Sequence, residues 1–354
     1  MADESSKHQI KLLIIGLFII LGLVVIMTIT AWLAIRICYS DEIKTVESVK
    51  KISDRPVVEI NYTGDYKFKE YLKYGSGNIM ETEKFLEDNL CKGLENFVSE
   101  GYKCSAFFAQ TPEGDYILAR NMDYEGSTLP AILRLNTKGI MKSLGISSFN
   151  HMDTVDSETL IEKFEAIYTP YMTYDGMNEF GLSVAAISAA DSYAVEQSDK
   201  VTIYDIEVVR LLLDEAKDVK DAKRIIEKYN VALSEEYPSH FIVCDAKGES
   251  IVIEYVSGSL QITECKDKYQ ILTDFLLCTG ERASDNGAEV YEAYEKALNK
   301  ADGRISTEDA MELLKENAVE GKAQWSVVYN MTKKCMTVSF SDDEERVYNY
   351  SLGE

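Results

Sequence analysis

The hydrophobic pattern changes abruptly near the amino terminus. A run of 24 residues without a charged side chain extends over residues 12–35, between Lys11 and Arg36. As a helix this run would be about 36 Å long, which is enough to cross a hydrocarbon core of about 30 Å. The pattern therefore predicts a short tail over residues 1–11 and a transmembrane helix over residues 12–35.

A cleaved signal peptide is the main alternative for this run. The apolar part of such a peptide is usually about 7–15 residues long and ends at a small-x-small cleavage site. The run here is longer, its match to such a site at Thr28-Ile29-Thr30 is weak, and Trp32 fits an interfacial anchor. Basic residues flank both ends of the run, but a short tail before a large domain favours a single-pass protein of the cell membrane. Its carboxyl-terminal domain is then expected outside the cytoplasm.

Beyond the anchor, the polar pattern predicts a linker or stalk over residues 40–55. Residues 56–62 alternate between polar and apolar side chains as a β-strand does, and residues 78–102 carry apolar side chains at helical spacing. The next stretch predicts a β-hairpin, because residues 105–110 and 115–120 flank a Thr-Pro-Glu-Gly turn. This hairpin is the strongest local signal in the chain.

The rest of the chain alternates between groups of short strands and pairs of helices. Helices are predicted at residues 202–217, 219–229, 288–300 and 307–318, and strands at residues 131–135, 183–190, 240–244, 250–256, 260–264, 269–275, 324–330 and 335–340. This order of hairpins and helical blocks favours an α+β fold over a parallel sheet.

Composition narrows the expected partners and cofactors. The 354 residues include 46% hydrophobic and 27% charged side chains, as in an ordinary globular protein, and carry a formal net charge of −23. This charge would repel nucleic acid and an anionic membrane surface, so neither is an expected partner. The seven cysteines are odd in number and form no C-x-x-C pair, and the chain has only three histidines. No zinc site, no other metal and no cofactor is therefore expected.

The predicted hairpin brings three reactive side chains together. Cys104 comes just before its first strand, and Arg120 and Asp123 lie at the end of its second strand, within reach of Cys104. A cation lowers the pKa of a neighbouring thiol and favours the nucleophilic thiolate, and a carboxylate can orient a general base. A buried cysteine beside an ordinary ion pair of Arg120 and Asp123 is the alternative interpretation.

A base for Cys104 is not evident among the histidines, and His240 lies in an ordinary strand segment. An α-amino group, with an unperturbed pKa of about 7.7–8.0, could act instead. Cleavage of the peptide bond between Lys103 and Cys104 would create such an amine on the nucleophile itself.

Three segments of the chain carry a family resemblance. They are CSAFFAQTPEGDYILARNMDY at residues 104–124, DGMNEFGLSVA at residues 175–185 and QWSVVYN at residues 324–330. In this order they resemble the choloylglycine hydrolase group of cysteine N-terminal-nucleophile hydrolases. That group includes penicillin V acylases, bile salt hydrolases and other linear amide C–N hydrolases. The resemblance extends from residue 104 to about residue 340.

The resemblance implies a four-layer αββα sandwich of two antiparallel sheets. It implies an amide hydrolase domain over residues 104–354, with residues 36–103 as a stalk and propeptide-like segment. It also implies that Cys104 is the nucleophile with its freed α-amine as general base, that Arg120 lies near the thiolate, and that Asp123 holds the amine. Attack on an amide carbonyl would then give a thioester that water hydrolyses.

Three positions depart from the family pattern. Ser188 stands where bile salt hydrolases carry an asparagine, Asp274 stands where an asparagine follows a Leu-Thr pair, and Val290 stands where an arginine precedes a Tyr-Glu-Ala-like sequence. An ionised carboxylate cannot donate a hydrogen bond to an oxyanion. The residues to consider for oxyanion or substrate contacts are Asn178, Ser188, Asp274 and Arg282. Shaping a loop is the more ordinary role for Asn178.

The sequence predicts a membrane-anchored hydrolase that cleaves linear amide C–N bonds of a small acylated amine or amino acid. Its expected partners are a small-molecule amide and, through one N-terminal helix, the membrane. A catalytically impaired relative that acts as a binding or scaffold protein is one alternative, and the three altered positions motivate it. An acyltransferase that uses the same thioester is another.

Overall fold

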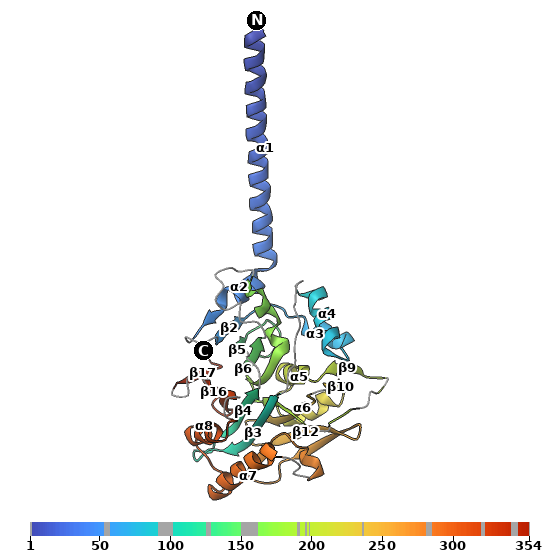
Figure 1. The fold of residues 1–354 in the computed structure, drawn as a ribbon, viewed down its shortest axis with the longest axis vertical. Coiled ribbons are helices and arrows are strands. Elements are labelled where there is room, and N and C mark those ends of the chain that lie inside the picture. The colour runs from blue at the N-terminus through green and yellow to red at the C-terminus, as the bar shows by residue number, and fades with distance from the viewer. Residues whose placement is uncertain are drawn as a thin grey trace.

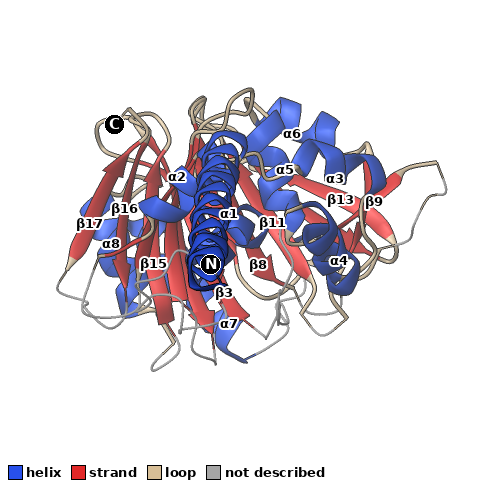
Figure 2. Cartoon of the chain, turned by 90° about the horizontal axis from the view of Figure 1, so that it is seen from above, coloured by secondary structure: helices blue, strands red, loops and turns tan. Residues whose placement is uncertain are grey.

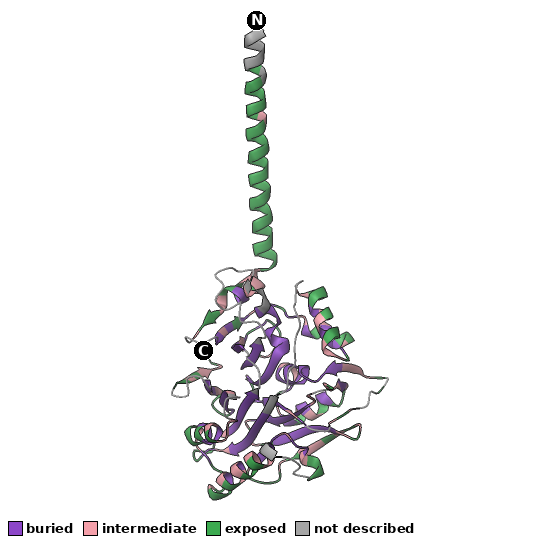
Figure 3. Cartoon of the chain, viewed as in Figure 1, coloured by how far each residue is buried: buried purple, intermediate pink, exposed green. Residues whose placement is uncertain are grey.

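In a computed structural model of the chain, the amino-terminal helix α1 (Ala2–Cys38) stands clear of the rest of the protein (Figure 1). Its stretch Ile10–Cys38 is long and apolar enough to cross a membrane, a property that a signal sequence near an amino terminus shares. Apolar side chains are exposed along this stretch (Figure 3). The structure describes residues 2–52, 57–90, 102–124, 129–149, 162–189, 192–194, 197, 199–235, 237–280, 285–319, 323–340 and 346–353.

The segment after α1 differs from the linker that the sequence predicts over residues 40–55. Helix α2 (Ser40–Ser48) occupies much of it, and only Tyr39 separates this helix from α1. Thr45 and Val46 are buried on its inner face. The segment is polar enough to indicate a linker because so short a helix buries only two of its residues.

Among the described residues, nine strands form the larger sheet, in the order β1-β2-β5-β6-β7-β8-β11-β12-β13. Their bounds are β1 (Lys50–Lys51), β2 (Val58–Tyr62), β5 (Leu129–Leu135), β6 (Ser143–Phe149), β7 (Thr173–Asn178), β8 (Ser183–Ser188), β11 (Ser239–Cys244), β12 (Ser250–Val256) and β13 (Ser259–Glu264). Neighbouring strands in this sheet are antiparallel except β2 and β5, which are parallel. The division of the chain at residue 104 into a stalk and a hydrolase domain stays a prediction. Strand β2 lies before this boundary but belongs to the same sheet as strands that lie after it.

In the described parts of the chain, six strands form the second sheet, in the order β14-β3-β4-β15-β16-β17, and the pairs between them are antiparallel. Their bounds are β3 (Tyr102–Gln110), β4 (Tyr116–Tyr124), β14 (Gln270–Leu272), β15 (Ala323–Asn330), β16 (Cys335–Phe340) and β17 (Val347–Ser351). The predicted hairpin is β3 and β4. A separate parallel pair joins β9 (Val201–Tyr204) and β10 (Tyr229–Ala232).

Helices cover the outer faces of the two sheets (Figure 2). On the larger sheet these are α3 (Phe68–Tyr74), α4 (Ile79–Asn89), the 3-10 helix η2 (Glu162–Met172), α5 (Glu207–Glu215) and α6 (Val219–Ile226). On the second sheet they are α7 (Asp285–Lys300) and α8 (Thr307–Glu316). A short 3-10 turn, η3 (Leu277–Thr279), follows β14.

Three layers of buried apolar side chains hold these elements together. Successive residues of β11 show the arrangement, because Phe241 packs under the helices of the larger sheet and Ile242 packs between the two sheets. Trp325 belongs to the layer between the sheets, and Tyr294 to the layer under α7 and α8. The α+β fold predicted from the sequence, a four-layer αββα sandwich of two sheets, is confirmed.

Candidate active site

Cys104 lies near the start of β3, with its side chain in the layer between the sheets. It is 5% exposed and pairs with Met122 of β4. The turn that joins these strands closes when the Gly114 N–H donates to the Thr111 carbonyl at 2.9 Å. Gly114 has a φ of 97°, a conformation that glycine adopts without strain. The local sequence therefore fixes the register that sets Cys104 beside the far end of β4.

Arg120 connects Cys104 to the centre of the protein. Its Nη2 donates to Cys104 Sγ at 3.2 Å and to the Ala186 carbonyl at 3.2 Å. Its Nη1 forms an ion pair with Asp175, and both of these side chains are fully buried. The guanidinium carbon also lies 5.3 Å from the ring centroid of Trp325, a cation–π contact. The guanidinium is therefore held on several sides at the position where it reaches the sulfur.

Asp175 belongs to this network, although it is not among the site residues predicted from the sequence. Its carboxylate accepts hydrogen bonds from Trp325 Nε1 at 3.0 Å and from the Tyr329 hydroxyl, in addition to the Arg120 contact. Burial raises the pKa of Asp175, and the charge of Arg120 opposes that rise. Each of the three segments that carry the family resemblance contributes to this network. The only hint of this role in the sequence is that Asp175 is the first residue of the second segment.

Burial raises the pKa of the Cys104 thiol to about 11, although the nearby Arg120 charge lowers it. The negative charge of Asp123 adds to the rise. Arg120 lowers the pKa of the thiol, as expected from the sequence, but the loss of hydration between the sheets raises this pKa by more. In the intact chain Cys104 is therefore a neutral thiol at neutral pH.

Asp123 lines a small pocket beside Cys104. Its backbone pairs across the hairpin with Lys103, the residue before Cys104, and its Oδ1 accepts a hydrogen bond from the Val319 N–H at 3.3 Å. The pocket has a volume of about 20 Å³, room for about one water molecule. Its lining comes from β3, β4, the loop after β14, α7 and the loop after α8, and consists of Cys104, Ser105, Asp123, Thr273, Asp274, Gly287, Val290 and Val319.

Two of the three departures from the family pattern lie in this pocket. Strand β14 pairs with β3 in a register that, continued by two residues, brings Asp274 opposite Cys104. A Cβ added to Gly287 would lie 1.6 Å from Asp274 Oδ1, so the carboxylate occupies space that a glycine leaves open at the start of α7. Val290, one turn further along α7, contributes an apolar side chain to the same pocket.

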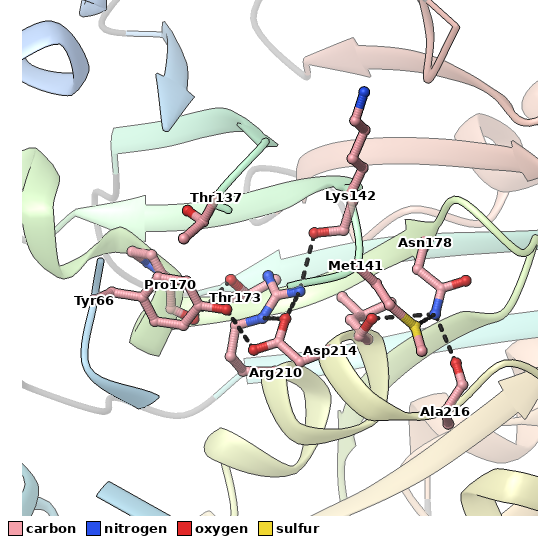
Figure 4. A network of polar contacts seen from close by, with 12 residues as sticks. Tyr66, Thr137, Met141, Lys142, Pro170, Thr173, Asn178, Arg210, Asp214 and Ala216 are labelled. Carbon is pink, nitrogen blue, oxygen red and sulfur yellow. Dashed lines mark hydrogen bonds and ion pairs between the residues drawn. The ribbon is translucent and has the colours of Figure 1, made fainter. Parts of the chain in front are cut away.

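Of the other residues considered for substrate contacts, the described ones, Asn178 and Ser188, do not line this pocket. Asn178 is buried, and its Nδ2 donates to the carbonyls of Leu213 at 3.1 Å and Ala216 at 2.7 Å (Figure 4). Its Oδ1 accepts from two backbone N–H groups of the following turn, so it shapes the loop between β7 and β8. Ser188 ends β8 and is half-buried. Arg282 lies outside the described residues.

A second buried polar pair, His240 and Glu254, joins β11 to β12. His240 Nδ1 and Glu254 Oε1 are 3.1 Å apart, and both side chains are fully buried. The Glu254 carboxylate also accepts from the backbone N–H groups of Leu277 at 2.6 Å and Cys278 at 2.9 Å. These bonds hold the turn η3, which follows Asp274. His240 therefore has a structural partner that a sequence pattern could not show.

A comparison with protein families gives the same assignment as the three sequence segments. The model described as linear amide C–N hydrolases, choloylglycine hydrolase family, matches residues 104–275. The resemblance predicted from the sequence is confirmed over these residues, which make up just under half of the chain. The match begins at Cys104 and ends before the third segment, residues 324–330.

Two curated relatives cover parts of the chain. A bile salt hydrolase/transferase from Lactiplantibacillus plantarum is 32% identical over 151 residues, which are 40% of this chain and 45% of that protein. An uncharacterised protein of Paramecium bursaria Chlorella virus 1 is 39% identical over 108 residues, which are 28% of this chain and 38% of that protein. The chain thus spans less than half the length of each of these relatives.

Two solved structures share the fold. A mutant conjugated bile acid hydrolase from Clostridium perfringens has a TM-score of 0.52 and 16% identity, and the match covers 71% of this chain and 92% of that one. A penicillin V acylase from Agrobacterium tumefaciens has a TM-score of 0.51 and 16% identity, and the match covers 71% of this chain and 87% of that one. At this identity the likeness shows the shared fold alone.

Proposed function

We propose that this protein is a cysteine N-terminal-nucleophile hydrolase that cleaves a linear amide C–N bond of a small acylated amine or amino acid. The observation that carries the proposal is the position of Cys104. Its sulfur lies 3.2 Å from the buried guanidinium of Arg120, and it lines a pocket together with Asp123. It is also the first residue of the family match.

Activation begins with cleavage of the peptide bond between Lys103 and Cys104. One water molecule is consumed, Lys103 gains a terminal carboxylate, and Cys104 gains a free α-amino group. Asp123 pairs with Lys103 across the hairpin and lines the pocket with Cys104, which supports a role for its carboxylate as the hydrogen-bond acceptor of the new amine. Because such an amine has an ordinary pKa of about 7.7–8.0, its neutral form can take the thiol proton near neutral pH.

In the cleaved protein, the α-amine takes the proton of Cys104 as the sulfur attacks the amide carbonyl. The Arg120 guanidinium stabilises the negative charge that develops on the sulfur. The tetrahedral intermediate collapses to a thioester, and the proton passes to the departing amine. Water then attacks the thioester with the same α-amine as base, which releases the acid and restores the thiol.

The altered positions opposite Cys104 favour a second candidate, a binding or scaffold protein with the same fold. Asp274 can donate a hydrogen bond only when it is protonated, and Val290 has no polar side-chain group. A third candidate is acyl transfer from the thioester to an amine acceptor. It is supported by the relative described as a bile salt hydrolase/transferase.

Intact-mass measurement and an amidase assay on the full-length protein test these candidates together. We expect a fragment that begins at Cys104 and hydrolysis of at least one member of a panel of N-acyl amino acids and N-acyl amines. Both should be lost in Cys104→Ala and kept in Cys244→Ala, which changes a second buried cysteine of the same layer. Full hydrolysis by Cys104→Ala would refute the proposal. An inactive, uncut chain would favour the scaffold, and amide products formed only with an added amine would favour the transferase.

For localisation, we propose that α1 anchors the protein in the cell membrane with the hydrolase part outside the cytoplasm. The exposed apolar surface of α1 supports this, because so large an apolar surface is unfavourable in water and favourable in a lipid bilayer. Proteolysis of intact cells should digest the carboxyl-terminal part and spare the amino-terminal tail. Recovery of a chain whose amino terminus lies just after α1, upstream of Cys104, would show instead that this helix is a signal sequence.

A further inference from the structure

The segment 57–90 lies upstream of Cys104, yet it is built into the hydrolase fold. Its strand β2 forms a parallel ladder with β5 over all five residues, Val58–Tyr62. The ladder is extended by the Asn136 N–H, which donates to the Tyr62 carbonyl at 2.8 Å. Without β2, the backbone groups of β5 along this edge would be unpaired and open to other strands.

Aromatic side chains of the upstream segment pack around Tyr171, a downstream residue. The ring centroids of Tyr66, Phe68 and Tyr71 lie 6.3, 5.5 and 5.6 Å from that of Tyr171, each in an edge-to-face arrangement. All four side chains are at most 1% exposed. Departure of the segment would therefore expose a large apolar surface on the downstream part.

Polar contacts also join the upstream segment to helix α5. The Tyr66 hydroxyl donates to Asp214, which forms an ion pair of 2.6 Å with Arg210 (Figure 4). Thr82 Oγ1 donates to Glu207 Oε1 at 2.8 Å, and the Glu207 side chain is fully buried. Removal of the segment would take hydrogen-bond donors away from two acidic side chains of α5, Glu207 and Asp214, which is costly for the fully buried Glu207.

We infer that cleavage before Cys104 leaves two polypeptides that remain one folded protein, with the upstream chain as a lasting subunit rather than a discarded propeptide. This inference rests on the proposed function for the cut itself. The hydrolase chain that begins at Cys104 is then tied to α1 by noncovalent contacts alone. Its release requires disruption of the β2–β5 edge and of the aromatic cluster, so catalysis stays at the membrane after activation.

Full-length protein with a different tag at each end tests this directly. After cleavage, the fragment that begins at Cys104 should sediment with membranes in high salt and should co-elute one-to-one with the amino-terminal fragment in mild detergent. The two fragments should separate only in denaturant. A folded fragment starting at Cys104 in the soluble fraction, with the amino-terminal fragment left in the membrane, would overturn the inference.

Two tyrosines of α3 provide matched variants for the interface. Tyr71 is 0% exposed and Tyr74 is 73% exposed. Tyr71→Ala should raise the fraction of hydrolase chain released from membranes at least tenfold, whereas Tyr74→Ala should leave it within twofold of the wild type. Equal release by the two variants would contradict a role for the buried cluster.

A second experiment separates retention of the fragments from self-cleavage. A Cys104→Ala chain carries a site-specific protease sequence inserted within residues 91–101 and is cut after folding. Fragments that stay together in high salt support the interface whatever the wild type does, and fragments that separate overturn it. An uncut wild-type chain would refute the proposed activation alone.

Discussion

The Asp175→Asn substitution removes one charge from a buried ion pair while nearly keeping the shape of the side chain. In the wild-type protein the Asp175 carboxylate faces Arg120 and accepts hydrogen bonds from Trp325 and Tyr329. In the variant the Arg120 guanidinium would stay buried opposite a neutral amide. One of the two acceptor oxygens would also become an NH₂ group that faces donors.

The expected loss of stability follows from the burial of both partners, whose side chains are 0% exposed. Removal of one partner of a buried ion pair typically costs about 3–5 kcal/mol. Coulomb's law gives the same order, about 4 kcal/mol for unit charges about 4 Å apart at an effective dielectric constant of about 20. Because native proteins are stable by only about 5–15 kcal/mol, the variant should lose a large share of its free energy of unfolding.

Denaturant unfolding of the full-length protein in detergent, followed by circular dichroism, measures this loss. Asp302→Asn is the matched control, because Asp302 pairs with Lys268 at the surface and such pairs contribute about 0–1 kcal/mol. The double variant Arg120→Met/Asp175→Leu leaves no charge buried alone and should recover part of the stability. A loss for Asp175→Asn no larger than that for Asp302→Asn would refute the reasoning.

Two further predictions concern single carboxylates. Asp274→Asn replaces the carboxylate opposite Cys104 by an amide that can donate a hydrogen bond, and it should raise kcat/KM for amide hydrolysis about tenfold or more. Asp274→Ala supplies no donor and should not raise it. Equal kcat/KM for the two variants would contradict a role for this position in contacting the oxyanion. Burial raises the pKa of Glu207 from 4.5 to about 8, so the folded protein holds this proton more tightly than the unfolded chain. The contribution of Glu207 to stability should therefore be greatest at low pH and fall as the pH rises from about 4.5 to about 8. Glu207→Gln should flatten this part of the thermal-unfolding profile, and an unchanged slope would count against it.

The β3–β4 hairpin could be predicted from the sequence because its determinants are local. Pro112 and Gly114 suit the turn, and alternating strands on either side set the register. Once the register is known, the proximity of Arg120 to Cys104 follows from counting residues. Helix α1 could be predicted for the same reason, since its apolar run is continuous along the chain.

The contacts that complete the site join residues that are far apart in the chain. Asp175 is separated from Arg120 by 55 positions and from Trp325 by 150 positions. Nothing in the sequence around Asp175 distinguishes a buried acceptor of several hydrogen bonds from an ordinary loop carboxylate. Asp274 likewise reaches the pocket only through the register of β14, a strand of three residues. These long-range contacts depend on how the strands and the two sheets are arranged in space, and a local sequence pattern does not predict that arrangement.

The protonation state of Cys104 is the point where local and distant effects oppose each other. Arg120, which the hairpin places beside the sulfur, lowers the thiol pKa, yet burial between the sheets raises it to about 11. A thiol of this kind is almost wholly protonated at neutral pH, so the uncut chain holds a weak nucleophile. The proposed cut needs to occur only once per molecule and can therefore be slow. In the proposed mechanism every later turnover has an α-amine on the same residue to remove the proton, so the burial that keeps the uncut cysteine protonated would also make catalysis depend on the cut.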